Sequence, residues 1–392
     1  MSFPKMKLGE CAEIHSGSTP RTNNPDFWDG DITWVTPKDL SKLKSKFISK
    51  TESKITQLGF DSCSTKLLPE NSVLFSSRAP IGHVAINTIP MCTNQGFKSF
   101  VPKADLLDSQ YLYYWLKANK EYLQDLGVGA TFKEISKTVI ANVEIPLPPL
   151  SEQRRIASIL DQADELRQKR QQAIEKLDQL LQATFIDMFG DPEKNPKKWN
   201  KVVLGDICDQ KDRVNYGVVQ PGNEFEGGVP LIRVGDIDGG ILSFHLIKRI
   251  DPEIEKDYSR SRIKGNEVLV SCVGSIGTIA KVPNEAIGFN IARAITRVPL
   301  QDKRIINFVA ECLKTEAIQN YFKKNTRTVS QPTLNVSFVK ETEIIFPNEE
   351  KILDFCKIVD KVEFQKELLQ KALVMQESLF QSLQNQAFNG TL

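Results

Sequence analysis

The chain repeats itself after about 195 to 199 residues, and this duplication constrains its fold more than any other feature. The matching segments keep their order in both halves: Leu8-Gly9-Glu10 recurs as Leu204-Gly205-Asp206, Asn71-Ser72-Val73-Leu74 as Asn266-Glu267-Val268-Leu269, and Ile81-Gly82 as Ile276-Gly277. An ordered series of matches at one offset indicates the duplication of a whole structural unit. The sequence therefore predicts two globular parts of the same kind.

Each half ends in a segment whose apolar residues follow the 3.5-residue period of a coiled-coil seam. The predicted seam comprises Ile156, Leu160, Ala163, Ile174, Leu177 and Leu181 in the first half, continuing to Thr184 and Met188, and Phe355, Val359, Val362, Leu369, Leu373, Phe380 and Leu383 in the second. A basic residue interrupts each seam at the same place, Arg167 in one copy and Lys366 in the other. Because a long helix with one apolar stripe is not stable alone in water, we expect the two helices to pair antiparallel along these seams.

The ends of the first helix can also be located. Ser151 follows Pro148-Pro149 and is a favourable N-cap, and Gly190 followed by Asp191-Pro192 is typical of a helix end. The predicted segments are a globular domain over 1–150, a helix over 151–190, a second globular domain over 191–347 and a second helix over 348–392.

The globular parts have a mixed pattern. Short β-rich runs, such as 31–35 and 268–271, are bounded by Gly, Pro and Asn, and helical stretches follow near 108–126 and 302–324. We therefore predict an α+β protein with two tandem α/β domains, separated by two long helices that form an antiparallel coiled coil, and with an internal pseudo-two-fold repeat.

Composition limits the function classes. No run approaches the roughly 18 uncharged apolar residues that a membrane span needs, and no apolar leader follows Met1, so we expect a cytoplasmic protein without a membrane partner. The seven cysteines and three histidines are scattered, which argues against a disulfide framework, a metal centre and histidine-based catalysis. The net charge of +2 allows nucleic-acid binding only through local basic clusters.

Several motifs resemble one known family. The relevant segments are Leu8-Gly9-Glu10, Ser16-Gly17-Ser18-Thr19-Pro20, Gly30-Asp31-Ile32-Thr33-Trp34-Val35, Asn94-Gln95-Gly96-Phe97, the block Ile145-Pro146-Leu147-Pro148-Pro149-Leu150-Ser151-Glu152-Gln153, and the tail Gln384-Asn385-Gln386-Ala387-Phe388-Asn389-Gly390. Over essentially its whole length the chain is similar to the specificity subunits of type I restriction-modification systems. The second copy departs from the pattern: 346–351 replaces the proline-rich block, and Asn290-Ile291-Ala292 stands where the first copy has Asn94-Gln95-Gly96.

The resemblance implies a non-catalytic, DNA-reading subunit used in host defence. Two target-recognition domains would each bind one half of a split, asymmetric site in double-stranded DNA. The paired helices would set the spacer between the half-sites and dock two modification (methyltransferase) subunits. Those subunits would hold S-adenosylmethionine and methylate adenine, and restriction subunits would add ATP- and Mg-dependent translocation and cleavage. No cofactor, metal or catalytic residue is expected in this chain, and it contains neither a phosphate-binding loop motif nor an Asn-Pro-Pro-aromatic motif.

Candidate DNA-binding residues follow from base and phosphate chemistry, since Arg and Lys suit guanine and phosphates, and Asn and Gln suit adenine. In the first domain they are Lys38, Lys42, Lys44, Lys46, Ser76, Ser77, Arg78, Asn94, Gln95 and Lys98; in the second they are Arg233, Ser271, Arg293, Arg327, Ser330 and Gln331. Structural roles compete with these assignments. Asn94 and Gln95 beside Gly96 also suit a turn, and Arg78 and Arg233 also suit internal ion pairs.

Two other functions stay open. A stand-alone adenine methyltransferase with built-in recognition domains would need a cofactor-binding domain, for which the duplication leaves no room. A coiled-coil adaptor that does not bind DNA would share the architecture.

Overall fold

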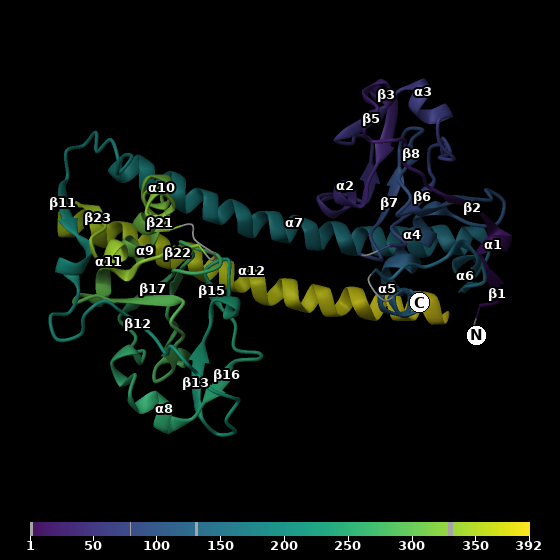
Figure 1. Cartoon of the computed structure of the whole chain (residues 1–392). Coiled ribbons are helices and arrows are strands. Elements are labelled where there is room, and N and C mark those ends of the chain that lie inside the picture. The colour runs from purple at the N-terminus through teal and green to yellow at the C-terminus, as the bar shows by residue number, and fades with distance from the viewer. Residues whose placement is uncertain (1–2, 79, 130–131, 328–331) are drawn as a thin grey trace. The chain divides into compact units, whose positions relative to one another are not determined.

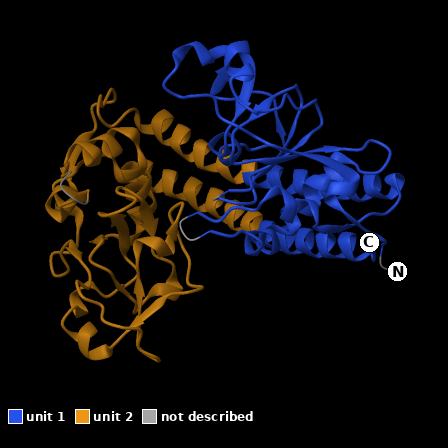
Figure 2. Cartoon of the chain, turned by 45° about the vertical axis from the view of Figure 1, so that its right-hand side comes forward, with its two compact units in different colours: residues 1–171, 371–392 blue, residues 172–370 orange. Residues whose placement is uncertain are grey.

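The computed structural model describes residues 3–78, 80–129, 132–327 and 332–392. The chain forms two compact units (Figure 2): unit 1 contains residues 1–171 and 371–392, and unit 2 contains residues 172–370. Both long helices, α7 (Leu150–Phe189) and α12 (Glu349–Asn389), therefore contribute to both units (Figure 1). This division does not coincide with the four segments predicted from the sequence, which remain a prediction.

The globular part of unit 1 precedes α7. Its elements are β1 (Lys5–Lys7), α1 (Leu8–Cys11), β2 (Ala12–Ser16), η1 (Pro25–Phe27), β3 (Trp28–Val35), α2 (Pro37–Ser41), β4 (Phe47–Ile48), β5 (Ser53–Ile55), α3 (Gln57–Asp61), β6 (Val73–Phe75), β7 (Val84–Asn87), β8 (Cys92–Thr93), β9 (Lys98–Pro102), α4 (Ser109–Ala118), α5 (Lys120–Asp125), α6 (Lys137–Ala141) and β10 (Glu144–Pro146).

The globular part of unit 2 lies between α7 and α12 in the chain. Its elements are β11 (Asn200–Val203), η2 (Leu204–Ile207), β12 (Asn215–Tyr216), β13 (Val229–Ile232), η3 (Val234–Asp236), β14 (Ile237–Asp238), β15 (Ile241–Leu242), β16 (Lys248–Ile250), α8 (Pro252–Lys256), η4 (Ser259–Ser261), β17 (Glu267–Ser271), β18 (Ile279–Lys281), η5 (Asn284–Ala286), β19 (Asn290–Ile291), β20 (Ile295–Pro299), η6 (Lys303–Ile305), α9 (Ile306–Lys314), α10 (Glu316–Lys324), β21 (Thr326–Arg327), β22 (Thr333–Leu334), α11 (Val336–Lys340) and β23 (Glu343–Phe346).

The sheets confirm the duplication, because four strands of the main sheet and all three strands of a second sheet have the same order in both units, while β4 is an additional edge strand of unit 1. The main sheet is ordered β2-β9-β6-β7-β4 in unit 1 and β12-β20-β17-β18 in unit 2. A three-stranded sheet is ordered β5-β3-β8 in unit 1 and β16-β13-β19 in unit 2, and its last two strands are parallel in both. A further antiparallel pair, β1-β10 or β11-β23, joins the beginning of each globular part to its end.

One short helix lies at the centre of each core. In α4 the side chain of Asp108 accepts hydrogen bonds from the first backbone N–H groups, and every residue from 111 to 116 is buried. In α9 every residue from 308 to 313 is buried. A helix that is apolar around its whole circumference must be covered on all sides. The sheet and the long helices provide this cover, as the aromatic contacts show: Tyr111 packs on Phe388, and Phe308 on Phe185.

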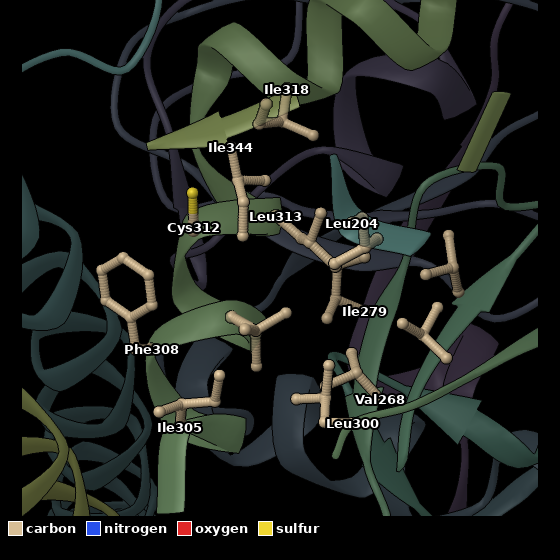
Figure 3. Close-up of a cluster of buried hydrophobic side chains, with 14 of the residues drawn as sticks. Leu204, Val268, Ile279, Leu300, Ile305, Phe308, Cys312, Leu313, Ile318 and Ile344 are labelled. Atoms are coloured by element: carbon tan, nitrogen blue, oxygen red, sulfur yellow. The ribbon is translucent and has the colours of Figure 1, made fainter. Parts of the chain in front are cut away.

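Figure 3 shows part of the core of unit 2, with Phe308, Cys312 and Leu313 of α9 among side chains from the sheet such as Val268 and Ile279. Burying each of these large side chains contributes roughly 1.5 to 3 kcal/mol to stability. The core of unit 1 is built in the same way around α4. Each unit thus has its own complete hydrophobic core.

The two long helices run antiparallel within each unit, as predicted. In unit 1 the guanidinium of Arg167 lies over the ring of Phe380 and pairs with Glu377 at 4.0 Å, and Arg155 donates to the carbonyl of Leu392. The contact near the start of α7 is thus with the residues after the end of α12, and a contact further along α7 is with an earlier part of α12, which is the antiparallel order.

In unit 2 the same antiparallel order is seen. Asp178 on α7 pairs with Lys366 on α12, and further along α7 the ring of Phe185 packs on that of Phe355. The two basic residues that interrupt the seams, Arg167 and Lys366, thus have the same role: each makes an ion pair with a carboxylate of the facing helix.

The predicted seam residues are covered to different degrees. Seven are buried, namely Ile156, Leu160, Ile174, Leu181, Phe355, Val359 and Val362, and six are half-buried, namely Ala163, Leu177, Leu369, Leu373, Phe380 and Leu383.

At the end of α7 the most buried side chains are Phe185 and Phe189, each one residue after the predicted seam positions Thr184 and Met188, which are half-buried. A straight helix has 3.6 residues per turn, so its buried face moves away from a strict 3.5-residue repeat.

The limits of α7 agree with its sequence at one end only. The helix begins at Leu150, so Ser151 lies in its first turn and is not the N-cap that the sequence predicts. Gly190 has a φ of 81°, a left-handed conformation that favours glycine, and its N–H donates to the carbonyl of Ile186 at 2.7 Å. Gly190 thus ends the helix as predicted.

Candidate nucleic-acid interface

A glycine at the end of one edge strand shapes the same surface in both units. A Cβ atom on Gly17 would lie 1.9 Å from the carbonyl oxygen of Asn94, and one on Gly217 would lie 1.7 Å from that of Ile291. Real Cβ atoms essentially never come so close to a backbone atom, so only glycine fits at either position. The close approach brings the residues after each glycine next to the turn that follows β8 or β19.

That turn has the same hydrogen bonds in both units. In unit 1 the N–H of Asn94 donates to Val35 and that of Phe97 to Asn94. In unit 2 the N–H of Ala292 donates to Ile232 and that of Ile295 to Ala292. Asn94 is therefore the counterpart of Ala292, and Gln95 that of Arg293.

These bonds correct the comparison made from sequence, which placed Asn290 opposite Asn94. Asn290 lies on β19 and pairs with Leu231, as Cys92 on β8 pairs with Trp34. It is fully buried and hydrogen-bonded to Ser261 at 2.7 Å, so it holds the interior together. The sequence comparison aligned Asn290 with Asn94 because both are asparagines. What the two units share at this turn is the backbone hydrogen bonding, which places Ala292 opposite Asn94.

In unit 2 the turn borders a groove of about 560 Å³. Its lining comprises Tyr216, Val219, Cys272, Val273, Arg293, Arg327, Thr333, Leu334, Asn335 and Val336. Arg293 and Arg327, two of the predicted DNA-binding residues, are exposed and come together here from the turn after β19 and from β21. Of the lining residues that the structure describes, none is acidic.

The corresponding surface of unit 1 carries different side chains. Thr19 donates to the amide oxygen of Gln95, and the guanidinium of Arg78 lies 5.5 Å from the ring centre of Phe132. Phe132 itself is 58% exposed. This surface therefore presents an amide, a cation and an aromatic ring to solvent.

Three predicted serines lie inside the protein. Ser76 and Ser271 occupy equivalent positions: the hydroxyl of Ser76 donates to Pro80 and accepts from the N–H of His83, and that of Ser271 donates to Ser275 and accepts from the N–H of Thr278. Ser77 is also fully buried and donates to the carbonyl of Gly96. These hydroxyl groups hold a turn at the end of β6 or β17.

Two predicted lysines have partners inside unit 1. Lys46 pairs with Asp161 of α7 and also donates to Gln110, and its side chain is 15% exposed. Lys98 is buried and pairs with Glu134 at 3.1 Å. Both ammonium groups are therefore engaged in holding the unit together.

The remaining predicted lysines of unit 1 lie within α2 or shortly after it. Lys38 and Lys42 both bind the carboxylate of Glu52. Hydrogen bonds from these two lysines lower the pKa of Glu52 to about 2, and the same carboxylate raises the pKa of Lys38. Lys44 is exposed and makes no ion pair with any residue in the described ranges. The local positive charge is thus smaller than the sequence suggests.

The other predicted positions have distinct outcomes. The side chain of Asn94 accepts the N–H of Gly96 at 2.9 Å, which is the turn-shaping role considered above. Arg233 forms an internal ion pair with Asp236 at 2.9 Å and also donates to the carbonyl of Leu246. Ser330 and Gln331 lie outside the described residues.

Sequence reasoning missed the residues beside the two glycines: Thr19 in unit 1, and Tyr216 and Val219 in unit 2. The information was present, since Gly17 and Gly217 lie close to the offset of the repeat and the residues around them differ between the copies. Phe132 was missed because a single exposed aromatic residue in a loop has no periodic pattern.

Among the residues that the structure describes, no cluster of three or more His, Cys, Asp or Glu side chains is arranged to hold a metal ion. Nor does any helix within the described ranges have the length and apolar character needed to cross a membrane.

Comparison with known proteins gives a consistent picture. A family model described as the type I restriction modification DNA specificity domain matches residues 2–176 and again residues 196–373. The MjaIX specificity subunit of a type I restriction enzyme from Methanocaldococcus jannaschii is 32% identical over an alignment of 378 positions, and the match covers 90% of this chain and 85% of that protein. The EcoBI specificity subunit from Escherichia coli is 28% identical over an alignment of 331 positions, and the match covers 77% of this chain and 70% of that protein.

Solved structures show the same fold. The S subunit of the type I restriction-modification system from M. genitalium superposes with a TM-score of 0.56 at 16% identity and covers 99% of this chain and 96% of its own. A chain from a study of complex assembly in a type I restriction-modification system superposes with a TM-score of 0.55 at 19% identity and covers 100% of this chain and 98% of its own.

Proposed function

The chain belongs to the family of type I restriction-modification specificity subunits, with two specificity domains in tandem, and we propose that each domain reads one half of a bipartite, asymmetric site in double-stranded DNA. One observation carries this proposal. The two matched regions fold alike, yet at the same place on their surfaces they carry different side chains, with Gln95 in unit 1 and Arg293 in unit 2. Copies that read two different half-sites need this combination of a shared scaffold and divergent surface chemistry.

The paired helices supply the second part of the proposal. α7 and α12 are continuous over 40 and 41 residues, and each has a length of about 60 Å at a rise of ~1.5 Å per residue. We propose that they set the number of unspecified base pairs between the half-sites. Inserting four residues after Leu177 is expected to lengthen the preferred spacer or abolish binding. An unchanged spacer in the methylation pattern would contradict this role.

The same helices are proposed to dock two modification subunits. Large apolar side chains are exposed along them, with Leu166, Val374, Met375 and Leu379 in unit 1, and Leu180, Ile358, Phe364 and Leu368 in unit 2. Exposed apolar side chains on one element favour burial against a partner protein.

Substitution of one such residue in each unit tests the docking. The variants Met375→Glu and Phe364→Glu should each weaken capture of the modification subunit. The matched control is Leu58→Glu, which changes a 64% exposed leucine of α3, away from the helices, and should leave capture unchanged. Equal capture by all three variants would exclude the helices as the docking surface.

We further propose that the chain acts in the cytoplasm as a non-catalytic subunit. Modification subunits would supply S-adenosylmethionine and adenine methylation, and restriction subunits would supply ATP- and Mg-dependent cleavage. This chain would provide only the DNA address.

The central experiment co-expresses the chain with its modification subunit and maps methylated adenines across the host genome. A single split motif with a fixed spacer is the expected result. Methyl transfer from labelled S-adenosylmethionine by the purified chain alone would instead favour a stand-alone methyltransferase. Absence of salt-sensitive DNA affinity, even with the modification subunit present, would favour a coiled-coil adaptor.

A further inference from the structure

We propose that the groove of unit 2 is a base-reading site in which Arg293 recognises a guanine, and that the turn position shared by Arg293 and Gln95 determines the base that each unit accepts. This inference rests on the function proposed above. It goes beyond that function because it assigns specificity to one structural position and names the chemistry at that position in each unit.

The first step is that both arginines of the groove are available. Four other arginines of unit 2 are paired with carboxylates: Arg233 with Asp236, Arg262 with Glu255, Arg297 with Asp212 and Glu267, and Arg304 with Asp302 and Glu349. In contrast, neither Arg293 nor Arg327 forms an ion pair with any residue that the structure describes. Together with the absence of acidic lining among the described residues, this leaves two guanidinium groups without a counter-charge on one concave surface.

The second step is that the backbone of these arginines is fixed. The N–H of Arg293 donates to the carbonyl of Val218 at 2.9 Å, and the turn is closed behind it by the bond from Ile295 to Ala292. Arg327 lies on β21, which pairs with β22 through Thr333. Side chains that start from a hydrogen-bonded backbone lose less entropy on binding than side chains on an unconstrained loop.

The third step is the chemistry of the ligand. A guanidinium can donate two parallel hydrogen bonds to O6 and N7 of guanine in the major groove, which is the commonest specific contact between proteins and DNA. Arg327, which also lines the groove, suits a backbone phosphate. Tyr216 is 44% exposed and adds an aromatic edge that can pack on a sugar or a thymine methyl group.

Two further exposed arginines have their backbone close to β12, the strand that carries Tyr216. The side chain of Asn215, the neighbour of Tyr216, donates to the carbonyl oxygens of Arg213 and Arg260, and both of these arginines are exposed. Within the described part of the chain neither of their guanidinium groups has an ion-pair partner.

The fourth step is the comparison with unit 1. Gln95 occupies the same turn position as Arg293, and its amide oxygen accepts a hydrogen bond from Thr19, whose counterpart is Val219. A glutamine amide can pair with N6 and N7 of adenine, whereas a guanidinium cannot match that pattern of donor and acceptor. The two units therefore differ in base-reading chemistry at one shared position.

The test uses the full complex of this chain with its modification subunit and maps methylated adenines for wild type, R293Q, R293K and R327Q. For R293Q, discrimination at one base pair of one half-site should fall roughly 5- to 150-fold, while the other half-site is unchanged. R293K should lose the same discrimination, because an ammonium lacks the two-pronged geometry of a guanidinium. R327Q should weaken binding to all sequences and lower the slope of log affinity against log salt by about one.

Two controls make the outcome decisive. K303Q removes one exposed positive charge on η6, outside this groove, and should leave the motif unchanged. Capture of the modification subunit and the unfolding curve should match wild type for every variant, since all the altered side chains are exposed. A wild-type motif in both R293Q and R293K would overturn the inference while leaving the proposed function intact. Failure of the wild-type complex to bind DNA would instead contradict the proposed function itself.

Discussion

Units 1 and 2 share the order of four strands in their main sheets, but they differ in a side chain buried in the second strand of that sheet. Ser99 on β9 pairs with His15, and its counterpart Arg297 on β20 pairs with Asn215. Both residues are fully buried. Unit 1 thus has a small hydroxyl group at a position where unit 2 has a large cation.

The buried cation of unit 2 is compensated by two carboxylates. Arg297 donates to Asp212 at 2.8 Å and to Glu267 at 3.0 Å, and it also donates to the carbonyl oxygen of Arg260. Glu267 in turn accepts three backbone N–H groups, from residues 264 to 266. The network therefore holds the surface segment that carries Arg260.

The difference shows that the fold depends on backbone pairing and apolar burial rather than on any one polar residue. A buried ion pair often adds little net stability, because desolvation opposes the Coulomb attraction. What Arg297 adds is a defined position for a surface segment of unit 2. Unit 1 has the same sheet without this connection.

The largest expected effect comes from removing the cation. Arg297→Met leaves Asp212 and Glu267 buried without it, and should lower the free energy of unfolding of unit 2 by about 3 to 5 kcal/mol. Ser99→Ala should change that of unit 1 by only about 0.5 kcal/mol or less, because the Ser99 hydroxyl has no hydrogen-bond partner among the described residues. Urea unfolding separates the units, since Trp199 is the only tryptophan in unit 2 and W199F leaves fluorescence from unit 1 alone. Equal losses would contradict the comparison.

Substitution of Gly17 and of Gly217 should lower the free energy of unfolding by similar amounts, unlike substitution of Ser99 and Arg297. Gly17→Ala and Gly217→Ala each force a Cβ atom onto a carbonyl oxygen and should each cost about 1 to 3 kcal/mol. The control is Gly235→Ala, where the added Cβ atom meets nothing within 4 Å and the change should be small. The same urea titrations measure all three variants. A loss confined to one unit would show that the shared turn is not equally important in both.

The stability of the two units should also differ in its dependence on acidic pH. Burial alone would raise the pKa of Asp212, but hydrogen bonds from Arg297 and Lys264 outweigh it and lower that pKa. Its contribution to stability is therefore complete above the unfolded pKa of about 3.9 and is lost as the pH falls through the lower folded value.

In unit 1 the lowered pKa of Glu52 acts in the same direction, but that carboxylate is exposed and screened by salt. The free energy of unfolding of each unit should be measured from pH 5 to pH 2, at low salt and at 1 M salt. We expect the decrease on acidification to persist at 1 M salt in unit 2 only. The variant D212N should remove most of the persistent part. Persistence in unit 1 as well would point to a different buried carboxylate.

The smallest effect is expected at the basic positions of the seams. Arg167 has three partners, since it also binds Asp164 at 2.7 Å beyond its contacts with Glu377 and Phe380. Lys366 has only Asp178 as an ion-pair partner in the described structure. Arg167→Met should therefore cost about 1 kcal/mol more than Lys366→Met, judged by thermal unfolding of the full chain. The reverse order would show that the ring contact contributes nothing.

Much of this architecture could be predicted from the sequence, because the relevant signals are local or periodic. The seam depends on the spacing of apolar residues, and Gly190 depends on the backbone preference of glycine; both appear in any window of the chain. The duplication was equally visible, since it needs only an ordered series of matches. None of these predictions required knowledge of which residues meet across the fold.

The candidate interface was harder to predict, because serine, lysine and arginine serve structure and DNA binding equally well. Lys46 and Lys98 bind carboxylates that are far away in the sequence, Asp161 and Glu134. Ser76 and Ser271 bond a neighbouring turn rather than facing solvent. Arg293 and Arg327 were among the predicted residues, but only the tertiary structure shows that they border one groove.

Unit 1 is formed from two segments that are far apart in the chain, and this has a consequence for its synthesis on the ribosome. Its core includes Ala387 and the ring of Phe388, which packs on Tyr111, although most of the unit ends at residue 171. At about 5 to 20 residues per second, the ribosome needs on the order of 10 to 40 seconds to make the intervening 199 residues. Throughout that interval the aromatic side of α4 lacks its final cover, so the nascent chain should be a substrate for chaperones that bind exposed apolar segments.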